Sequence, residues 1–303
     1  MVNQAFINKA KELGFIAVGF SKPREPIFFD FFLQWVKEVE VGNMSYLKRN
    51  IDLRKDPTTL LDGLQTIISL AYPYPAGKPS TPDGYTTSRY STPQQEDYHF
   101  RLRNLARQLC TFITESFPES RNRICIDSAP VLERDFAVMS GIGFIGKNNM
   151  LIVPGFGSYC FLVDILTTAA FPVTSLKMPE NVCGSCTRCI ESCPTGALRA
   201  PFYMQASKCL SYLTIESKDD IDRDVTNKMG NTFFGCDVCQ EVCPFNKNSC
   251  PVVLLPATQT ILEMTEFEFK RTFGNTVFKR TGLNKIKRTI SSLKEKTPQL
   301  IHV

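Results

Sequence analysis

Residues 183–194 read Cys183-Gly-Ser-Cys186-Thr-Arg-Cys189-Ile-Glu-Ser-Cys193-Pro194, and this stretch decides the fold. The spacing C-x2-C-x2-C-x3-C-P is that of the bacterial run that binds 4Fe-4S clusters. Three closely spaced thiolates can bind one cubane, whereas the fourth cysteine, placed before proline, binds the other cluster of a two-cluster module. The spacing therefore predicts a ferredoxin-like module with two 4Fe-4S clusters.

A second run, Cys236-x2-Cys239-x3-Cys243-Pro244, repeats the last three positions of the motif. Phe233 stands where its first cysteine would fall, and Cys209 is the spare cysteine that could replace it. Zinc sites also use paired cysteines, but two runs that both end in Cys-Pro are typical of clusters. We expect the first cluster on Cys183, Cys186, Cys189 and Cys243, and the second on Cys193, Cys209, Cys236 and Cys239.

The cysteine usage also bears on the compartment. Of the twelve cysteines, Cys110, Cys125 and Cys160 lie in apolar segments and are expected in the core, while Cys250 has no assigned role. Residues 1–13 predict an amphipathic helix, not a signal peptide. The most apolar stretch, 159–173, is interrupted by Asp164 and Pro172 and is too short for a membrane helix. We therefore expect reduced, metal-binding cysteines in a cytoplasmic protein that does not enter a membrane.

The positive charge is concentrated at the C-terminal end. The net charge of the 303 residues is +5, yet from Lys270 onward nine basic residues face one acidic residue, a net charge of +8. Such a basic tail favours an anionic partner such as nucleic acid. A solvated helix with lysines on its outer face is the alternative.

The pattern of apolar residues predicts an α+β protein. We expect helices over 3–13, 27–40, 94–117 and 130–140, and strands over 16–20, 66–72, 123–127, 150–153 and 159–166. Residues 76–93 are rich in Pro, Gly, Ser and Thr and are predicted to form a loop. The expected division is a sheet domain over 1–175, the cluster module over 176–255 and a basic helical tail over 256–303.

A glycine-rich segment, Gly141-Ile-Gly143-Phe-Ile-Gly146-Lys147-Asn148, follows the predicted helix over 130–140. It fits the dinucleotide spacing, and it fits the Walker spacing except that Asn148 stands where Ser or Thr would bind magnesium. Both motifs need a preceding strand, and here a helix precedes the loop. We therefore discount both phosphate-binding interpretations.

At these residues the chain resembles the epoxyqueuosine reductase family. The resemblance covers about residues 40–250 and rests on segments that occur in the right order. They are 44–47, 54–57, 97–99, 127–130, Glu133-Arg134, 141–148, Gly157-Ser158 and the double-cluster module.

The resemblance implies a cobalamin-binding N-terminal domain of nitroreductase-like fold, related to those of reductive dehalogenases. The implied reaction reduces epoxyqueuosine in tRNA to queuosine. Electrons from an external low-potential donor would pass through both clusters to cobalamin. We further expect a monomer.

The resemblance also implies roles for individual residues. Glu133 stands where the family carries an acidic proton donor, and burial would raise its pKa enough to keep the proton; a salt bridge is the structural alternative. Asp135 is a weaker candidate, because two residues along a helix it would point to a different face. His99 is either a cobalt ligand or a structural histidine. The implied cofactor-binding residues are Tyr98, His99, Arg134, Gly141, Gly143, Gly146, Lys147, Asn148 and Ser158.

Two other functions remain open at the level of sequence. Many family members extend past 303 residues with a helical-repeat region that helps to grip tRNA, so we expect either that the basic tail grips tRNA here or that recognition differs. A cobalamin-dependent reductase of small molecules, such as a dehalogenase, is one alternative, although dehalogenases usually carry a twin-arginine export signal. An electron carrier for a corrinoid partner protein is the other, and it would not need Glu133.

Overall fold

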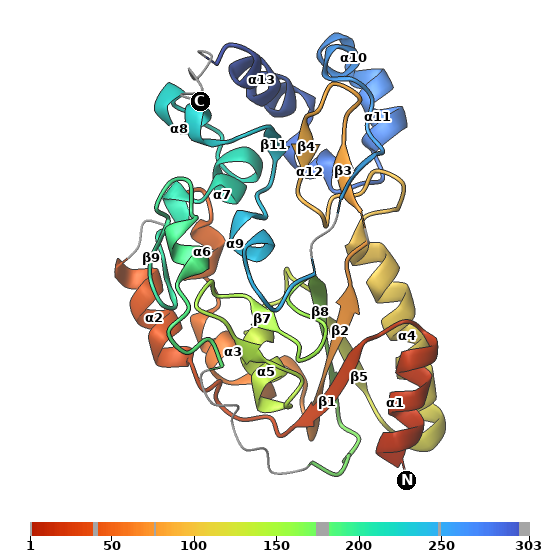
Figure 1. Ribbon diagram of the computed structural model, residues 1–303. Coiled ribbons are helices and arrows are strands. Elements are labelled where there is room, and N and C mark those ends of the chain that lie inside the picture. The colour runs from red at the N-terminus through yellow and green to blue at the C-terminus, as the bar shows by residue number, and fades with distance from the viewer. Residues whose placement is uncertain (1, 39–41, 76, 174–181, 248–249, 297–303) are drawn as a thin grey trace.

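A four-stranded antiparallel sheet forms the lower part of the computed structural model, which describes residues 2–38, 42–75, 77–173, 182–247 and 250–296 (Figure 1). The strand order is β1 (Ala17–Ser21), β2 (Thr66–Pro73), β8 (Cys160–Thr167) and β5 (Asn122–Cys125). The central strands β2 and β8 are buried over most of their length. Their continuous apolar runs, rather than alternating ones, follow from being covered on both faces.

Helices cover the two faces of this sheet. On one face α1 (Val2–Glu12) and α4 (Tyr98–Ser116) pack on a core that includes Phe6, Leu102, Val163 and Ile165. On the other face the short helix α5 (Glu133–Met139) packs through Phe136 and Met139 against Leu166. Because side chains alternate along a strand, even-numbered residues of β8 face α5.

A second, smaller sheet joins distant parts of the chain. Its order is β11 (Thr232–Phe234), β4 (Thr86–Thr87), β3 (Lys78–Ser80) and β12 (Pro251–Val253), and β11 and β12 run parallel to their neighbours. The prediction of a loop over 76–93 is therefore wrong for β3 and β4. These short strands pair with residues 146 to 173 positions further along the chain, which the local composition of Pro, Gly, Ser and Thr does not indicate.

The cysteine-rich region is built from short elements. They are α6 (Arg188–Glu191), β9 (Leu198–Ala200), β10 (Tyr203–Met204), α7 (Leu210–Ile215), α8 (Arg223–Lys228) and α9 (Val238–Glu241). Helices α6 and α9 pack against each other near the centre of the molecule (Figure 1). The hairpin of β6 (Phe144–Ile145) and β7 (Leu151–Ile152) lies below them.

The C-terminal segment is helical, as predicted. Helices α10 (Thr258–Glu263), α11 (Glu266–Phe273), α12 (Phe278–Thr281) and α13 (Leu283–Lys294) lie at the top in Figure 1. A core containing Phe233, Phe234, Phe278 and Ile290 joins them to the cysteine-rich region. Phe233, which replaces a cysteine of the second motif, is thus a core residue. Residues 297–303 of the predicted tail lie outside the described residues.

Three predicted helices begin later than expected, and the helix predicted over 27–40 begins at Phe29. The helix predicted over 94–117 begins at Tyr98, because Asp97 accepts a hydrogen bond from the His99 amide and acts as its N-cap. The helix predicted over 130–140 begins at Glu133. The remaining helices are α2 (Phe29–Glu38) and α3 (Ile51–Lys55). Within the described residues, no helix has both the length and the apolar character needed to cross a membrane.

Candidate functional site

Four cysteine thiols come together around a small cavity. Cys183, Cys186, Cys189 and Cys243 line it, together with Lys147 and Phe245 among others. Burial raises the pKa of the Cys189 thiol, and the neighbouring Cys243, Cys183 and Cys186 add to the shift. The structure therefore brings together the four residues that the sequence assigned to the first cluster.

The other four cysteines form a second group, which includes Cys239 of α9. Burial raises the pKa of Cys236 to about 12, with contributions from Cys209 and Cys193. Burial also raises the pKa of Cys239, and the neighbouring Cys236 and Cys209 raise it further. Cys209, which belongs to neither motif, lies at the N-terminus of α7 and reaches this group from there. Within the described residues, no three His, Cys, Asp or Glu side chains are placed to hold a single metal ion.

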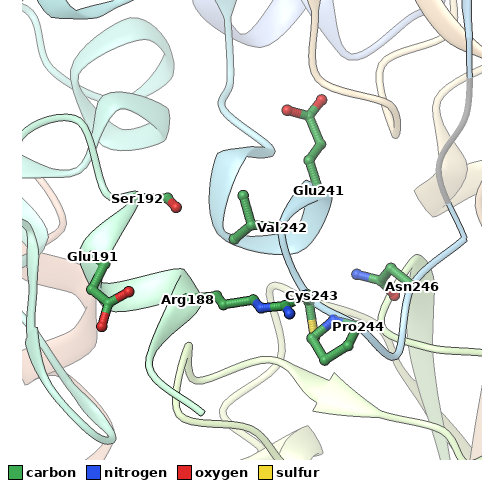
Figure 2. Close-up of a pocket in the computed structure, with 8 residues that line it drawn as sticks. All are labelled: Arg188, Glu191, Ser192, Glu241, Val242, Cys243, Pro244 and Asn246. Carbon is green, nitrogen blue, oxygen red and sulfur yellow. The ribbon is translucent and has the colours of Figure 1, made fainter.

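A cavity of about 460 Å³ opens beside the first group, between α6 and α9. Figure 2 shows Arg188 extending from α6 toward Cys243 and Pro244. The other lining residues are mostly polar: Glu191, Ser192, Glu241, Val242 and Asn246. This side of the Cys243 thiol is therefore open to solvent and to small solutes.

The glycine-rich segment follows α5, as expected from its sequence, and Gly141 ends that helix with a φ of 75°. A side chain at Gly143 or Gly146 would collide with Ile152 of β7. These two glycines are thus needed for the close packing of the β6–β7 hairpin. Because β7 fills the space, the segment does not form an open cradle for a phosphate.

Lys147, Asn148 and Ser158, three of the implied cofactor-binding residues, instead form hydrogen bonds with the segments that carry the cysteines. Lys147 Nζ donates hydrogen bonds to the carbonyl oxygens of Gly184 (2.6 Å) and Cys186 (3.0 Å). Asn148 Nδ2 donates to the Cys239 carbonyl oxygen at 3.2 Å. Both cysteine groups are therefore braced from the same loop.

Ser158 also forms hydrogen bonds with the cysteine-rich region. Its amide donates to Asn246 Oδ1 at 2.6 Å, and its hydroxyl accepts hydrogen bonds from Gln240 Nε2 (3.0 Å) and Asn246 Nδ2 (2.9 Å). Arg134, also implied as a cofactor contact, is exposed and donates to the Asn149 carbonyl oxygen. The polar groups of Ser158 and Arg134 are therefore engaged within the protein.

Glu133 and Asp135 point in different directions, as the helical spacing predicted. Glu133 Oε1 accepts a hydrogen bond of 2.6 Å from the Asp127 amide. Burial, followed by the nearby charges of Asp164 and Asp127, raises the pKa of Glu133 well above its usual value. Asp135 is buried toward the start of α2, where its Oδ1 accepts from the Phe28 amide at 2.7 Å, and burial raises its pKa to about 6.

His99 lies between two carboxylates. Its Nδ1 is 2.6 Å from Asp97 Oδ1 and its Nε2 is 3.1 Å from Asp127 Oδ2. Burial alone would lower the pKa of His99, but the hydrogen bonds to Asp127 and Asp97 outweigh it and raise the value to about 9. An imidazolium has no lone pair to give to a metal. In this structure both ring nitrogens of His99 are engaged by carboxylates, as in a structural histidine.

Tyr98 joins the same group. Its hydroxyl donates to Asp127 Oδ2 at 3.0 Å, and its ring stacks on His99 and on Phe161, with centroids 4.1 and 4.3 Å away. Asp127 therefore binds both of the implied pocket residues through its side chain and Glu133 through its amide.

Sequence reasoning missed several members of this site. Arg280 of α12 forms an ion pair with Glu216, and its guanidinium lies 3.9 Å from Asp127 Oδ2. From the sequence, Arg280 was recognised only as one of the basic residues of the C-terminal tail. Arg54, buried against the Phe32 ring, lies within electrostatic reach of Glu133. The buried Asp164 had one signal in the sequence, since it interrupts an apolar strand.

Most of the basic tail residues that lie in helix α13 or just after it are engaged within the protein. Lys285 and Lys287 donate to the carbonyl oxygens of Asp219 and Met264. Arg288 pairs with Asp220 at 2.8 Å, and Lys296 donates to the Gly230 carbonyl oxygen. The exposed tail cations that form no hydrogen bond or ion pair with a described residue are Lys270, Arg271, Lys279 and Lys294. The +8 charge of the tail therefore overstates what it can offer to an anionic partner.

Comparison with protein families gives two matches. Residues 54–128 match the family described as epoxyqueuosine reductase QueG, DUF1730. Residues 182–246 match the 4Fe-4S double cluster binding domain, and this range contains all eight cysteines of the two groups.

The similarity to individual proteins extends over nearly the whole chain. The epoxyqueuosine reductase of Cellulophaga algicola is 35% identical, with 94% of this chain and 96% of the relative covered. That of Bacillus subtilis is 30% identical over 90% of this chain and 74% of the relative. A crystal structure of epoxyqueuosine reductase with a tRNA-Tyr epoxyqueuosine-modified tRNA stem loop has a TM-score of 0.83 and 28% identity. The match covers 96% of this chain and 80% of the chain in that structure.

Proposed function

This chain belongs to the epoxyqueuosine reductase family, and from that premise we propose that it reduces epoxyqueuosine in tRNA to queuosine. One observation carries the proposal. A single chain joins two groups of four thiols to Glu133, a half-buried acid whose pKa is raised well above its usual value. An electron carrier would need the thiols but not the acid.

We propose that the first group of thiols holds one 4Fe-4S cluster and the second group holds the other. The donor set fits, because burial disfavours bare thiolates and bound iron would reverse that shift by stabilising them. The clusters would supply electrons one at a time. An external low-potential donor must provide these electrons, and the open cavity beside Cys243 leaves a route of approach.

We propose cobalamin as the further cofactor, bound within residues 1–175 on the side of Glu133. One observation fits it: Arg54, which interacts electrostatically with Glu133, has a buried Nε without a hydrogen-bond partner among the described residues. An amide oxygen of a corrin side arm could accept this hydrogen bond. Arg54 would hold the cofactor, whereas Lys147, Asn148 and Ser158 brace the clusters. When bound, cobalamin would supply reduced cobalt for the two-electron step.

Glu133 then carries the proton chemistry. Removal of the epoxide oxygen as water consumes two electrons and two protons, and it leaves a carbon–carbon double bond. One of these protons must reach the oxygen as its bond to carbon breaks. Glu133 can supply it, because burial raises the pKa of its carboxyl well above the usual value and so favours the protonated form. The Asp127 amide, which donates to Oε1, fixes the direction of that carboxyl.

The substrate would approach from the side of the C-terminal helices. We propose that Lys270, Arg271, Lys279 and Lys294 bind tRNA phosphates, since these exposed cations have no hydrogen-bond or ion-pair partner within the described residues. Such contacts give salt-dependent affinity without reading sequence. Arg280 links this segment to Asp127.

The test is turnover of epoxyqueuosine-containing tRNA by anaerobically reconstituted protein under a strong reductant, with and without cobalamin. Queuosine formed only with cobalamin is the expected result. Failure to form queuosine, with both clusters intact and cobalamin bound, would overturn the assignment. Reduction of a small organohalide by the same preparation would instead favour a dehalogenase-like reductase.

A further inference from the structure

Asp164 is a buried carboxyl group in the middle of β8. The residue is 1% exposed, and its Oδ1 accepts a hydrogen bond of 2.6 Å from Ser69 Oγ on the neighbouring strand. Its Oδ2 is also buried, and it has no hydrogen-bond partner among the described residues. A buried carboxylate with one unsatisfied oxygen is unfavourable, so its presence calls for an explanation.

The sheet places Asp164 on the face that α5 covers. Residues of β8 alternate between faces, and Leu166, two positions on, packs with Phe136 of α5. Asp164 therefore faces α5, whose first residue is Glu133. On the adjacent strand Cys125 lies opposite Asp164, and the Asp127 amide, two residues further, binds Glu133.

The two carboxyl groups are electrostatically coupled. Burial is the largest cause of the raised pKa of Glu133, and Asp164 is the next, ahead of Asp127. Burial raises the pKa of Asp164 itself to about 7, against the hydrogen bond from Ser69. The other ionisable groups that face Glu133 are Arg134, Arg54 and Cys125.

Neither arginine offsets this coupling with a direct contact. Within the described residues, neither Arg134 nor Arg54 forms a hydrogen bond or ion pair with Glu133. Two like charges in a buried site cannot both be present at low energy. The pair therefore favours keeping a proton, and Glu133 is the member that is hydrogen-bonded to Asp127.

We propose that Asp164 is a positioning residue whose negative charge holds the proton on Glu133 until the leaving oxygen takes it. This role rests on the proposed function of Glu133 as the acid. The proton moves from Glu133 to the oxygen as the carbon–oxygen bond breaks. Repulsion between the two carboxylates then favours rapid return of a proton from solvent to Glu133.

The direct test is infrared spectroscopy of the holoenzyme over a range of pH, with the Glu133 carboxyl band identified by its loss in Glu133→Gln. In Asp164→Asn the midpoint of that band should move down by about one pH unit or more. Ser69→Ala should move it in the same direction, since Asp164 without its donor stays neutral and no longer repels. Asp135→Asn, a buried carboxyl on the same helix, should leave the midpoint unchanged.

Activity gives a second readout. The alkaline limb of the kcat profile should shift with the infrared midpoint, and Asp164→Glu should restore part of the shift. An unchanged Glu133 midpoint in both Asp164→Asn and Ser69→Ala would overturn the inference, even if the wild type converts its substrate. A wild type that makes no queuosine would instead overturn the proposed function, and the infrared result would stand by itself.

Discussion

The backbone amide of Asp127 donates a hydrogen bond of 2.6 Å to Glu133 Oε1. Asp127 has a φ of 52°, in the left-handed region that residues other than glycine rarely adopt. In this conformation its amide binds Glu133 and its carboxylate binds His99 and Tyr98. Local strain of this kind persists where a site needs it. Asp127 thus links the acid to the imidazolium beside it.

The substitution Glu133→Gln removes the proton donor but keeps the acceptor for the Asp127 amide. We expect queuosine formation to fall by about 100-fold or more, in the range typical of lost general acid catalysis. Iron content and tRNA affinity should be unchanged. Single-turnover rates with prereduced enzyme are the measurement, because they exclude effects on electron supply.

Asp135→Asn separates the two candidate acids. The amide oxygen of asparagine can still accept from Phe28, and Asp135 faces away from Asp127. Turnover should stay within a few-fold of the wild type. If Asp135→Asn were the inactive variant and Glu133→Gln the active one, the assignment of the acid would be reversed.

The substitution Cys209→Ser tests the ligand that lies outside both motifs. Cys209 belongs to the second group of thiols, so its loss should remove one cluster and lower the iron content by about half. Cys250→Ser, an exposed cysteine outside both groups, is the control and should retain all iron. Iron analysis with electron paramagnetic resonance of the reduced protein distinguishes them. Full iron content in Cys209→Ser would contradict the proposed ligand set.

The cysteine spacing was sufficient to predict the thiol groups, and apolar periodicity predicted the main sheet and its helices. Both signals are local in sequence, or come from a motif whose geometry is known. The sheet of β3, β4, β11 and β12 could not be predicted in this way. Its strands have two or three residues each and depend on partners far along the chain.

The candidate site shows the same limit. Glu133 and His99 were recognisable by residue type and resemblance, but Arg280 and Arg54 join them only in the folded chain. Charge counting also treated all nine basic tail residues alike, although Lys285 is 6% exposed and donates to a carbonyl oxygen. Tertiary packing decides which basic side chains form contacts within the protein. A count of charges along the sequence does not contain this information.

Lys147→Met should weaken the bracing of the first cluster. The change removes two charge-assisted hydrogen bonds to the Gly184 and Cys186 carbonyl oxygens, one of which is typically worth about 2 kcal/mol. We expect faster loss of half the iron in the presence of a chelator, with the second cluster retained. The exposed Lys11→Met is the control. Equal rates of iron loss in both variants would show that Lys147 does not brace the cluster.

The imidazolium of His99 should make stability depend on pH. Its pKa is about 9 in the folded protein and about 6.5 in the unfolded chain, so the folded state binds more protons between these values. The stabilisation is complete below about pH 6.5 and is lost as the pH rises through about 9. The difference in unfolding midpoint between wild type and His99→Gln should shrink over this range. A difference that is constant from pH 6 to 9.5 would contradict the assignment.

Exposed and engaged cations of the C-terminal helices should differ in their effect on tRNA binding. Lys279 and Lys294 are exposed, so Lys279→Gln or Lys294→Gln should weaken binding and lower the salt slope by about one for each lost phosphate contact. Lys11→Gln, on α1 at the opposite end of the molecule in Figure 1, should leave the slope unchanged. Because Lys287 donates to the Met264 carbonyl oxygen, Lys287→Gln should lower thermal stability while leaving the slope near that of the wild type. Titrations between 50 and 200 mM salt measure how the tRNA affinity depends on salt concentration. Equal slopes in all four variants would show that these helices do not contact tRNA phosphates.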